Sequence, residues 1–196
     1  NNGAYTGFSF VIGFLFVFRT SQAYNRFWEG VTCGHRMYAE WFDFASSVVA
    51  FSRYSTTDRE KTLVFHHRLA RLLSLLHAGT SATLSGEDAS HFELIDVDGL
   101  GVDALQRVVT SEHPTSLVSQ WIQELVIEAQ HDGVVAAPPP IVSRCFQEFA
   151  NGMVQFHDAL KIPSTPIPFP YTQMSAILLI AHLVVTPFVM CQWVKW

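Results

Sequence analysis

The chain has 196 residues, of which 49% are hydrophobic, 13% aromatic and 15% charged. Soluble domains carry about 25% charged residues, so this chain is short of charge, while 16 Phe and 5 Trp supply enough apolar surface to exclude a disordered chain. The net charge of −5 argues against a partner bound through nucleic-acid phosphates. Three widely spaced cysteines fit neither a disulfide framework nor a zinc pattern.

The first segment, residues 1–18, contains no Asp, Glu, Lys or Arg and ends sharply at Arg19. It has neither an initiator Met nor a basic region, so it does not have the features of a signal peptide. We expect it to be the surviving part of a membrane span whose start is missing. Thr6, Phe10 and Phe14 recur every four residues and therefore share one face of this helix.

Residues 19–161 hold all but one of the charged residues and show helical spacing, with no period-two alternation typical of strands. The chain is therefore predicted to be all-α. Residues 80–104 are rich in Ser, Gly and Asp and are predicted to form a loop with a short turn of structure. Four helical stretches are predicted in this region: 19–55, 57–79 with a Thr57–Glu60 capping box and a stop at Gly79, 115–130 with a stop at Asp132-Gly133, and one that follows Pro140.

The second charge-free segment covers residues 162–194. Its apolar part, 174–194, is long enough for a membrane span of about 20 residues. Pro187 lies within this part and is tolerated in a membrane helix when neighbouring groups satisfy the freed carbonyl. The alternative is a core helix of a soluble protein, which requires 174–194 to be buried entirely within protein.

No pattern in the chain is typical of catalysis or metal binding. His66 and His67 are adjacent, so on a helix they point about 100° apart, and no HExxH arrangement is present. Asp96, Asp98 and Asp103 faintly resemble a calcium loop, but other residue types occupy two ligand positions of the EF-hand register. We therefore predict no enzyme activity, and no cofactor is assigned.

Two motifs in the chain resemble the bestrophin family of chloride channels. Residues 18–30, FRTSQAYNRFWEG, are similar to the FRTNxAYxRWWEG pattern at the end of the second transmembrane segment of bacterial, plant and algal members. Residues 162–173, IPSTPIPFPYTQ, resemble the segment that opens the third. The order of spans and amphipathic helices also matches, so the resemblance covers essentially the whole chain. The family's first and fourth spans are expected to be missing from this fragment.

The resemblance implies a homopentamer around a central pore that continues through a helical vestibule in the cytosol. Applied to this chain, it implies a pore-lining membrane helix at 1–28 and a cytosolic helical region at 29–161. A Pro-rich start and a second membrane helix follow at 162–196. The protein would then be an integral membrane protein with a bestrophin-like fold.

By the same resemblance, Phe10 and Phe14 fall on the family's pore neck. Thr6 falls where an apolar residue is usual, so the outer collar is expected to be wetter. Ile167, between two prolines, aligns with the narrow cytosolic aperture. The alternatives are that the phenylalanines pack against lipid or other helices, and that Ile167 belongs to an ordinary Pro-rich connector.

Five residues of the first motif complete the candidate site: Arg19, Tyr24, Arg26, Trp28 and Glu29. Arg26 and Glu29 lie three residues apart and so share a helix face, which favours a structural ion pair. The role of Arg19 is left open between a structural pair and a charge that raises the local anion concentration.

The function that follows is passive conduction of anions, with chloride as the permeant ion and bicarbonate as a second candidate. The main alternative is a non-conducting membrane scaffold that binds partner proteins or pigments through its aromatic lipid face, and the third is a soluble helical interaction protein. The motif favours a thylakoid or other organellar membrane, with the plasma membrane as the alternative. Calcium regulation is left open, because the acidic segment of animal family members lies beyond this chain.

Overall fold

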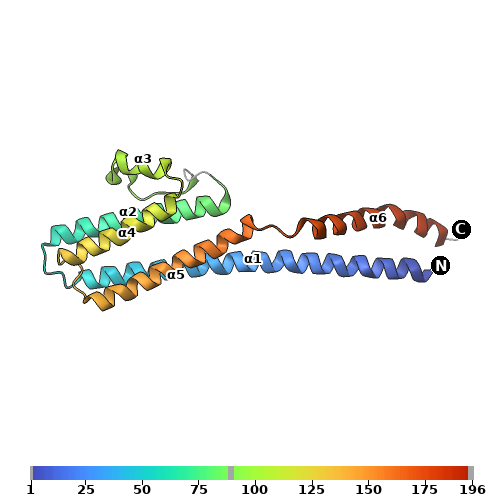
Figure 1. The fold of residues 1–196 in the computed structure, drawn as a ribbon, viewed down its shortest axis with the longest axis horizontal. Coiled ribbons are helices and arrows are strands. Elements are labelled where there is room, and N and C mark those ends of the chain that lie inside the picture. The colour runs from blue at the N-terminus through green and yellow to red at the C-terminus, as the bar shows by residue number, and fades with distance from the viewer. Residues whose placement is uncertain (1, 88–90, 194–196) are drawn as a thin grey trace. The chain divides into compact units, whose positions relative to one another are not determined.

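The computed structural model describes residues 2–87 and 91–193 of the chain, and every regular element in these ranges is helical (Figure 1). The all-α prediction is therefore confirmed. The elements, in order, are α1 (Asn2–Ser52), α2 (Arg59–Ser85), the 3₁₀ helix η2 (Val97–Leu100), α3 (Val102–Thr110), α4 (Pro114–His131), α5 (Pro139–Ser164) and α6 (Phe169–Trp193).

The chain divides into two compact units. The terminal unit combines residues 1–32 with 161–196, and the central unit comprises residues 33–160. Helix α1 begins in the terminal unit and ends in the central unit. Helix α5 begins in the central unit, and its last residues belong to the terminal unit.

Helix α1 is 51 residues long and joins the charge-free segment to the helix predicted after Arg19. Proline breaks a helix because it lacks the backbone N–H, and the first proline of this chain is Pro114. Residues 2–52 therefore contain no proline that could interrupt α1, and the helix ends at the turn that follows Ser52.

The core of the central unit is formed by the second part of α1 together with α2, α4 and α5. Each helix contributes apolar residues three and four positions apart, which is the spacing of one buried helix face. The most completely buried of these apolar side chains are Phe44, Val48, Leu69, Leu76, Val118, Ile122, Val126, Phe149 and Phe156.

The start and end of α2 differ from the prediction. The expected Thr57–Glu60 capping box is wrong, because the Thr57 hydroxyl donates to the carbonyl of Asp132 at 2.7 Å and Asp58 occupies the cap position without a side-chain cap bond. The expected stop at Gly79 is also wrong. The helix continues to Ser85 and ends at Gly86, whose φ of 73° is left-handed and favours glycine.

The expected loop at 80–104 contains more helix than predicted. Its first six residues belong to α2, and its last ones to η2 and the start of α3. Asp96 forms an ion pair with Arg71, whose Nε lies 3.0 Å from the Asp96 carboxylate, so this carboxylate is engaged by a cation from the protein itself.

Candidate functional site

In the terminal unit, α6 packs against the first part of α1, and one contact between them is polar. The hydroxyls of Tyr5 and Thr186 lie 2.9 Å apart, and the ring of His182 stacks on Tyr5 with centroids 5.8 Å apart. Ile12 lies on the same side of α1 and is only 5% exposed. This face of α1 is therefore occupied by a helix of the same chain.

The predicted neck residues lie on a different face of α1. Phe10 is 76% exposed and Phe14 63%, and Thr6 is exposed too. The ring of Phe14 stacks on Phe18 at 6.4 Å, and Phe18 meets Tyr171 of α6 edge-on at 5.8 Å. The described residues of the chain leave this aromatic stripe exposed, and a contiguous exposed apolar surface of this kind is typical of a contact with lipid or protein.

Helix α6 and the first part of α1 are both long and apolar enough to cross a membrane. Only 6% of the apolar window of each helix is buried within the chain. In α6, for example, Leu183 is 73% exposed and Phe188 is 71% exposed. The interpretation of 174–194 as a soluble core helix requires burial, and the described residues of this chain do not provide it.

Arg26 joins α1 to the end of α5. Its guanidinium donates to the backbone carbonyl of Thr165 at 3.0 Å and to that of Ile162. The last carbonyls of a helix lack partners within the helix, and a cation there also opposes the negative end of the helix dipole. Gly30, one turn further along α1, lies beside the side chain of Ile162, since a Cβ at Gly30 would be in van der Waals contact with the Ile162 Cδ1 atom at 3.4 Å.

The expected Arg26–Glu29 ion pair is wrong. Among the residues that the structure describes, no ion pair joins these two side chains, and Glu29 is exposed. The spacing of three residues between Arg26 and Glu29 allows an ion pair. The Arg26 guanidinium instead binds the carbonyls of Ile162 and Thr165, about 140 positions away in the sequence, and local spacing does not reveal such a contact.

The remaining motif residues are not gathered at one place. Tyr24 and Trp28 are 60% and 50% exposed, and their rings meet edge-on at 6.0 Å. Arg19 is half-buried, as is Ile167. The structure thus brings Arg26 to the Pro-rich segment that carries Ile167, while Thr6, Phe10 and Phe14 share an exposed face.

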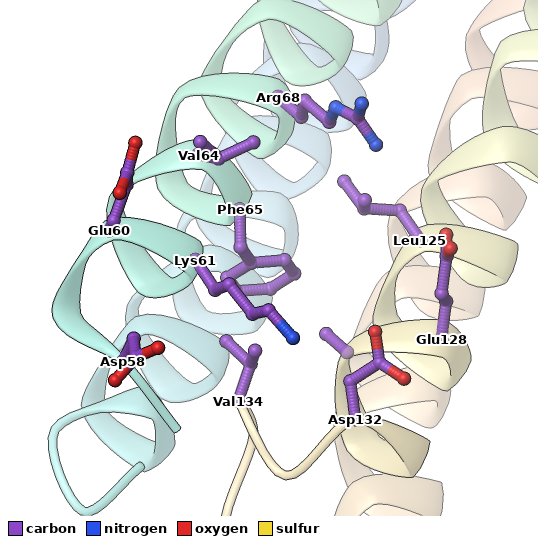
Figure 2. Close-up of a pocket in the computed structure, with 11 residues that line it drawn as sticks. Asp58, Glu60, Lys61, Val64, Phe65, Arg68, Leu125, Glu128, Asp132 and Val134 are labelled. Carbon is purple, nitrogen blue, oxygen red and sulfur yellow. The ribbon is translucent and has the colours of Figure 1, made fainter. Parts of the chain in front are cut away.

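The central unit contains a cavity of about 500 Å³ between α2 and α4 (Figure 2). Phe65, Leu125 and Val134 give it an apolar wall, and charged side chains of both signs surround it. This cavity could not be predicted from local sequence patterns, since its walls come from two helices that η2 and α3 separate in the chain. In the described part of the chain, no group of three or more His, Cys, Asp or Glu side chains could hold a metal ion.

Comparisons with known proteins agree on one family. The sequence model described as "Bacterial/Fungal Bestrophin protein" matches residues 1–196. A voltage-dependent anion channel-forming protein of Nostoc sp. is 27% identical over 190 residues, which cover 96% of this chain and 59% of that protein. The chain therefore spans about three fifths of the length of this relative.

Solved structures of a bacterial bestrophin homologue from Klebsiella pneumoniae have the same fold. One point mutant superposes with a TM-score of 0.82 over 98% of this chain and 68% of that one, at 14% sequence identity. A second mutant gives a TM-score of 0.79 over 95% of this chain and 65% of that one, again at 14% identity. At this identity the similarity establishes the fold alone.

Proposed function

The chain belongs to the bestrophin family, and from this premise we propose that it is a subunit of an integral-membrane channel that conducts anions passively. The observation that carries the proposal is the exposed stripe of Thr6, Phe10 and Phe14 on a helix whose other face is occupied by α6. We further propose that five copies surround one axis and turn this stripe inward. The similarity to the Nostoc channel-forming protein supports anions as the permeant species.

In such a ring, Phe10 and Phe14 would each form a collar of five aromatic side chains. A narrow apolar collar gates by losing its water, which gives the pore an energetic barrier without a charged residue. The edge of an aromatic ring is the positive part of its quadrupole, so edge-on phenylalanines favour anions over cations. The collars would therefore act as both gate and selectivity element for chloride, and for bicarbonate as a second candidate.

The charge distribution supports anions in the membrane part. Residues 1–32 and 161–196 contain four basic residues, Arg19, Arg26, Lys161 and Lys195, against the single acidic residue Glu29. The remaining eight basic and sixteen acidic residues of the chain fall in the central unit. The unit that would line the pore is thus positive in a chain that is negative overall, and positive charge raises the local concentration of anions.

The second candidate is a membrane scaffold of the same fold that does not conduct. It is favoured by exposed aromatic side chains that lie outside the proposed neck, namely those of Tyr24, Phe27 and Trp28. Such a surface could bind a membrane partner or a pigment. A thylakoid or other organellar membrane is proposed for either function on the basis of the AYNRFWEG motif alone.

Anion flux in liposomes distinguishes the two functions. The full-length wild-type protein is expected to release chloride, and the double variant Phe10→Ala/Phe14→Ala is expected to conduct several times more, with less preference for anions, because the collars are wider. Phe16→Ala is the matched control: Phe16 is exposed on the same helix, about 160° around the axis from Phe14. Absence of wild-type flux would favour the scaffold, and an effect of Phe16→Ala equal to that of the double variant would contradict the proposed neck.

A further inference from the structure

A cavity of about 550 Å³ lies in the terminal unit, where the Pro-rich segment meets α1 and the start of α6. Most of its wall is apolar, and Arg26 is the one charged side chain among the residues that line it. These residues are Arg26, Pro166, Ile167, Pro168, Phe169 and Thr172.

The contacts of Arg26 leave its charge available to a ligand. A guanidinium has five N–H donors, and the bonds to Ile162 and Thr165 go to carbonyl oxygens, which carry no formal charge. Glu29 is the only acidic residue in the sequence of the terminal unit, and within the described residues it forms no ion pair with Arg26. The two carbonyls therefore fix the orientation of the guanidinium but do not neutralise it.

The surroundings of this cation suit a small anion that holds its water weakly. The guanidinium is itself weakly hydrated and can meet such an anion without a large desolvation cost. Phe169 and Thr172 belong to the first turn of α6, so the positive end of that helix dipole lies at the cavity and opposes the negative end of α5, to which Arg26 is bonded. The side chains of Ile167 and Phe169 give the cavity apolar walls, and it stays open on one side, so an ion can enter it.

We propose that this cavity is a binding site for a small inorganic anion of the halide type, held by Arg26 beside Ile167. The inference rests on the proposed channel function, in which the site would be a station for the permeant ion at the cytosolic aperture. In this role Arg26 both holds the end of α5 and contacts the ion.

Bromide identifies the site directly. Crystals of the full-length protein grown or soaked in bromide are expected to show an anomalous peak inside the cavity, within hydrogen-bond distance of the Arg26 guanidinium. Bromide peaks elsewhere with none in the cavity would overturn the site. This result is independent of conduction, so absence of wild-type chloride flux would contradict the proposed function and leave the bromide result to decide the site.

The salt dependence of the current separates a charge effect from a structural one. Arg26→Gln is expected to lower chloride current several-fold near 10 mM salt, because it removes from every subunit a positive charge that contacts the ion. At about 1 M salt the difference should be clearly smaller, because the screening length falls to about 3 Å. Arg26→Lys should restore most of the low-salt current.

The control is Arg53→Gln, which removes the same charge from an exposed position of the central unit. A structural role for Arg26 alone would lower the current by the same factor at both salt concentrations, and that result, or no change at either, would overturn the proposal. If Arg26→Gln does not assemble, the bromide experiment on the wild-type protein decides.

Discussion

Gly152 in α5 lies directly against the indole of Trp41 in α1, in the core of the central unit. A Cβ added at this position would overlap the Nε1 and Cδ1 atoms of Trp41. The indole has little room to move, since it is 6% exposed and lies 6.4 Å from the ring of Phe149, centroid to centroid. The absence of a side chain at Gly152 therefore allows α1 and α5 to approach closely.

Gly152→Ala should consequently destabilise the protein. Overpacking costs about 1–3 kcal/mol, whereas alanine gains about 1 kcal/mol over glycine inside a helix. We expect a net loss of about 1 kcal/mol, seen as a fall of about 2–4 °C in the Tm of the detergent-solubilised protein. Gly34→Ala is the matched control, because nothing lies within 4 Å of a Cβ at Gly34 and the gain in helix propensity should raise the Tm. Equal increases for both variants would contradict the described contact.

His66 in α2 binds Ser52, which is the last residue of α1. The Ser52 hydroxyl donates to the carbonyl of Val49 at 2.7 Å and lies 2.6 Å from the His66 Nε2 atom. A hydroxyl has only one hydrogen to donate, so it accepts from Nε2, which must carry the proton. Burial, with a smaller contribution from the neighbouring charge of His67, lowers the pKa of His66 below its ordinary value.

The lowered pKa of His66 predicts that acid destabilises the central unit. The unfolded chain binds a proton at pH values where folded His66 does not, so the free energy of unfolding falls as the pH drops through about 6.5. This contribution is fully present above that pH. Chemical denaturation of the solubilised protein at pH 8, 7, 6 and 5 should show a smaller acid-dependent loss for His66→Gln than for wild type. Identical pH dependence in the two proteins would rule out this role for His66.

At the scale of whole elements, the sequence predicts best where a chemical signal is local. The helix expected over 115–130 is α4, which begins one residue earlier at Pro114, and the helix expected after Pro140 is α5, which begins at Pro139. Gly133, with a φ of 75°, follows the end of α4 as expected from Asp132-Gly133. The end of α2 is predicted wrongly because two glycines compete, and only Gly86 adopts the left-handed conformation that ends the helix. Propensity alone does not distinguish them, since Gly79 fits the helix interior.

The candidate site shows the same limit. A four-residue repeat places Thr6, Phe10 and Phe14 on one face of α1, and the structure shows that α6 leaves all three exposed. That they line a pore stays a prediction. The partners of Arg26 are missed by sequence reasoning, because they are backbone carbonyls 136 and 139 positions away in the chain. The prolines of residues 162–168 lack backbone N–H groups, so the sequence indicates that carbonyls nearby need hydrogen-bond donors from elsewhere in the protein. It does not indicate which residue provides them.

At the scale of the molecule, both membrane-length helices expose apolar side chains that no described residue of the chain covers. An isolated copy would need lipid over its entire terminal unit, including the Thr6–Phe10–Phe14 stripe. A ring of copies instead removes that stripe from lipid and gives it a shared axis, while the outward faces stay in contact with acyl chains. The positive charge of the terminal unit would then lie around the same axis.

The most direct test of this account is a cryo-electron-microscopy structure of the full-length protein in lipid nanodiscs. We expect five copies around one axis, with the Phe10 and Phe14 side chains innermost and forming the narrowest part of the pore. A monomer, or an oligomer in which these two phenylalanines point toward lipid, would contradict it.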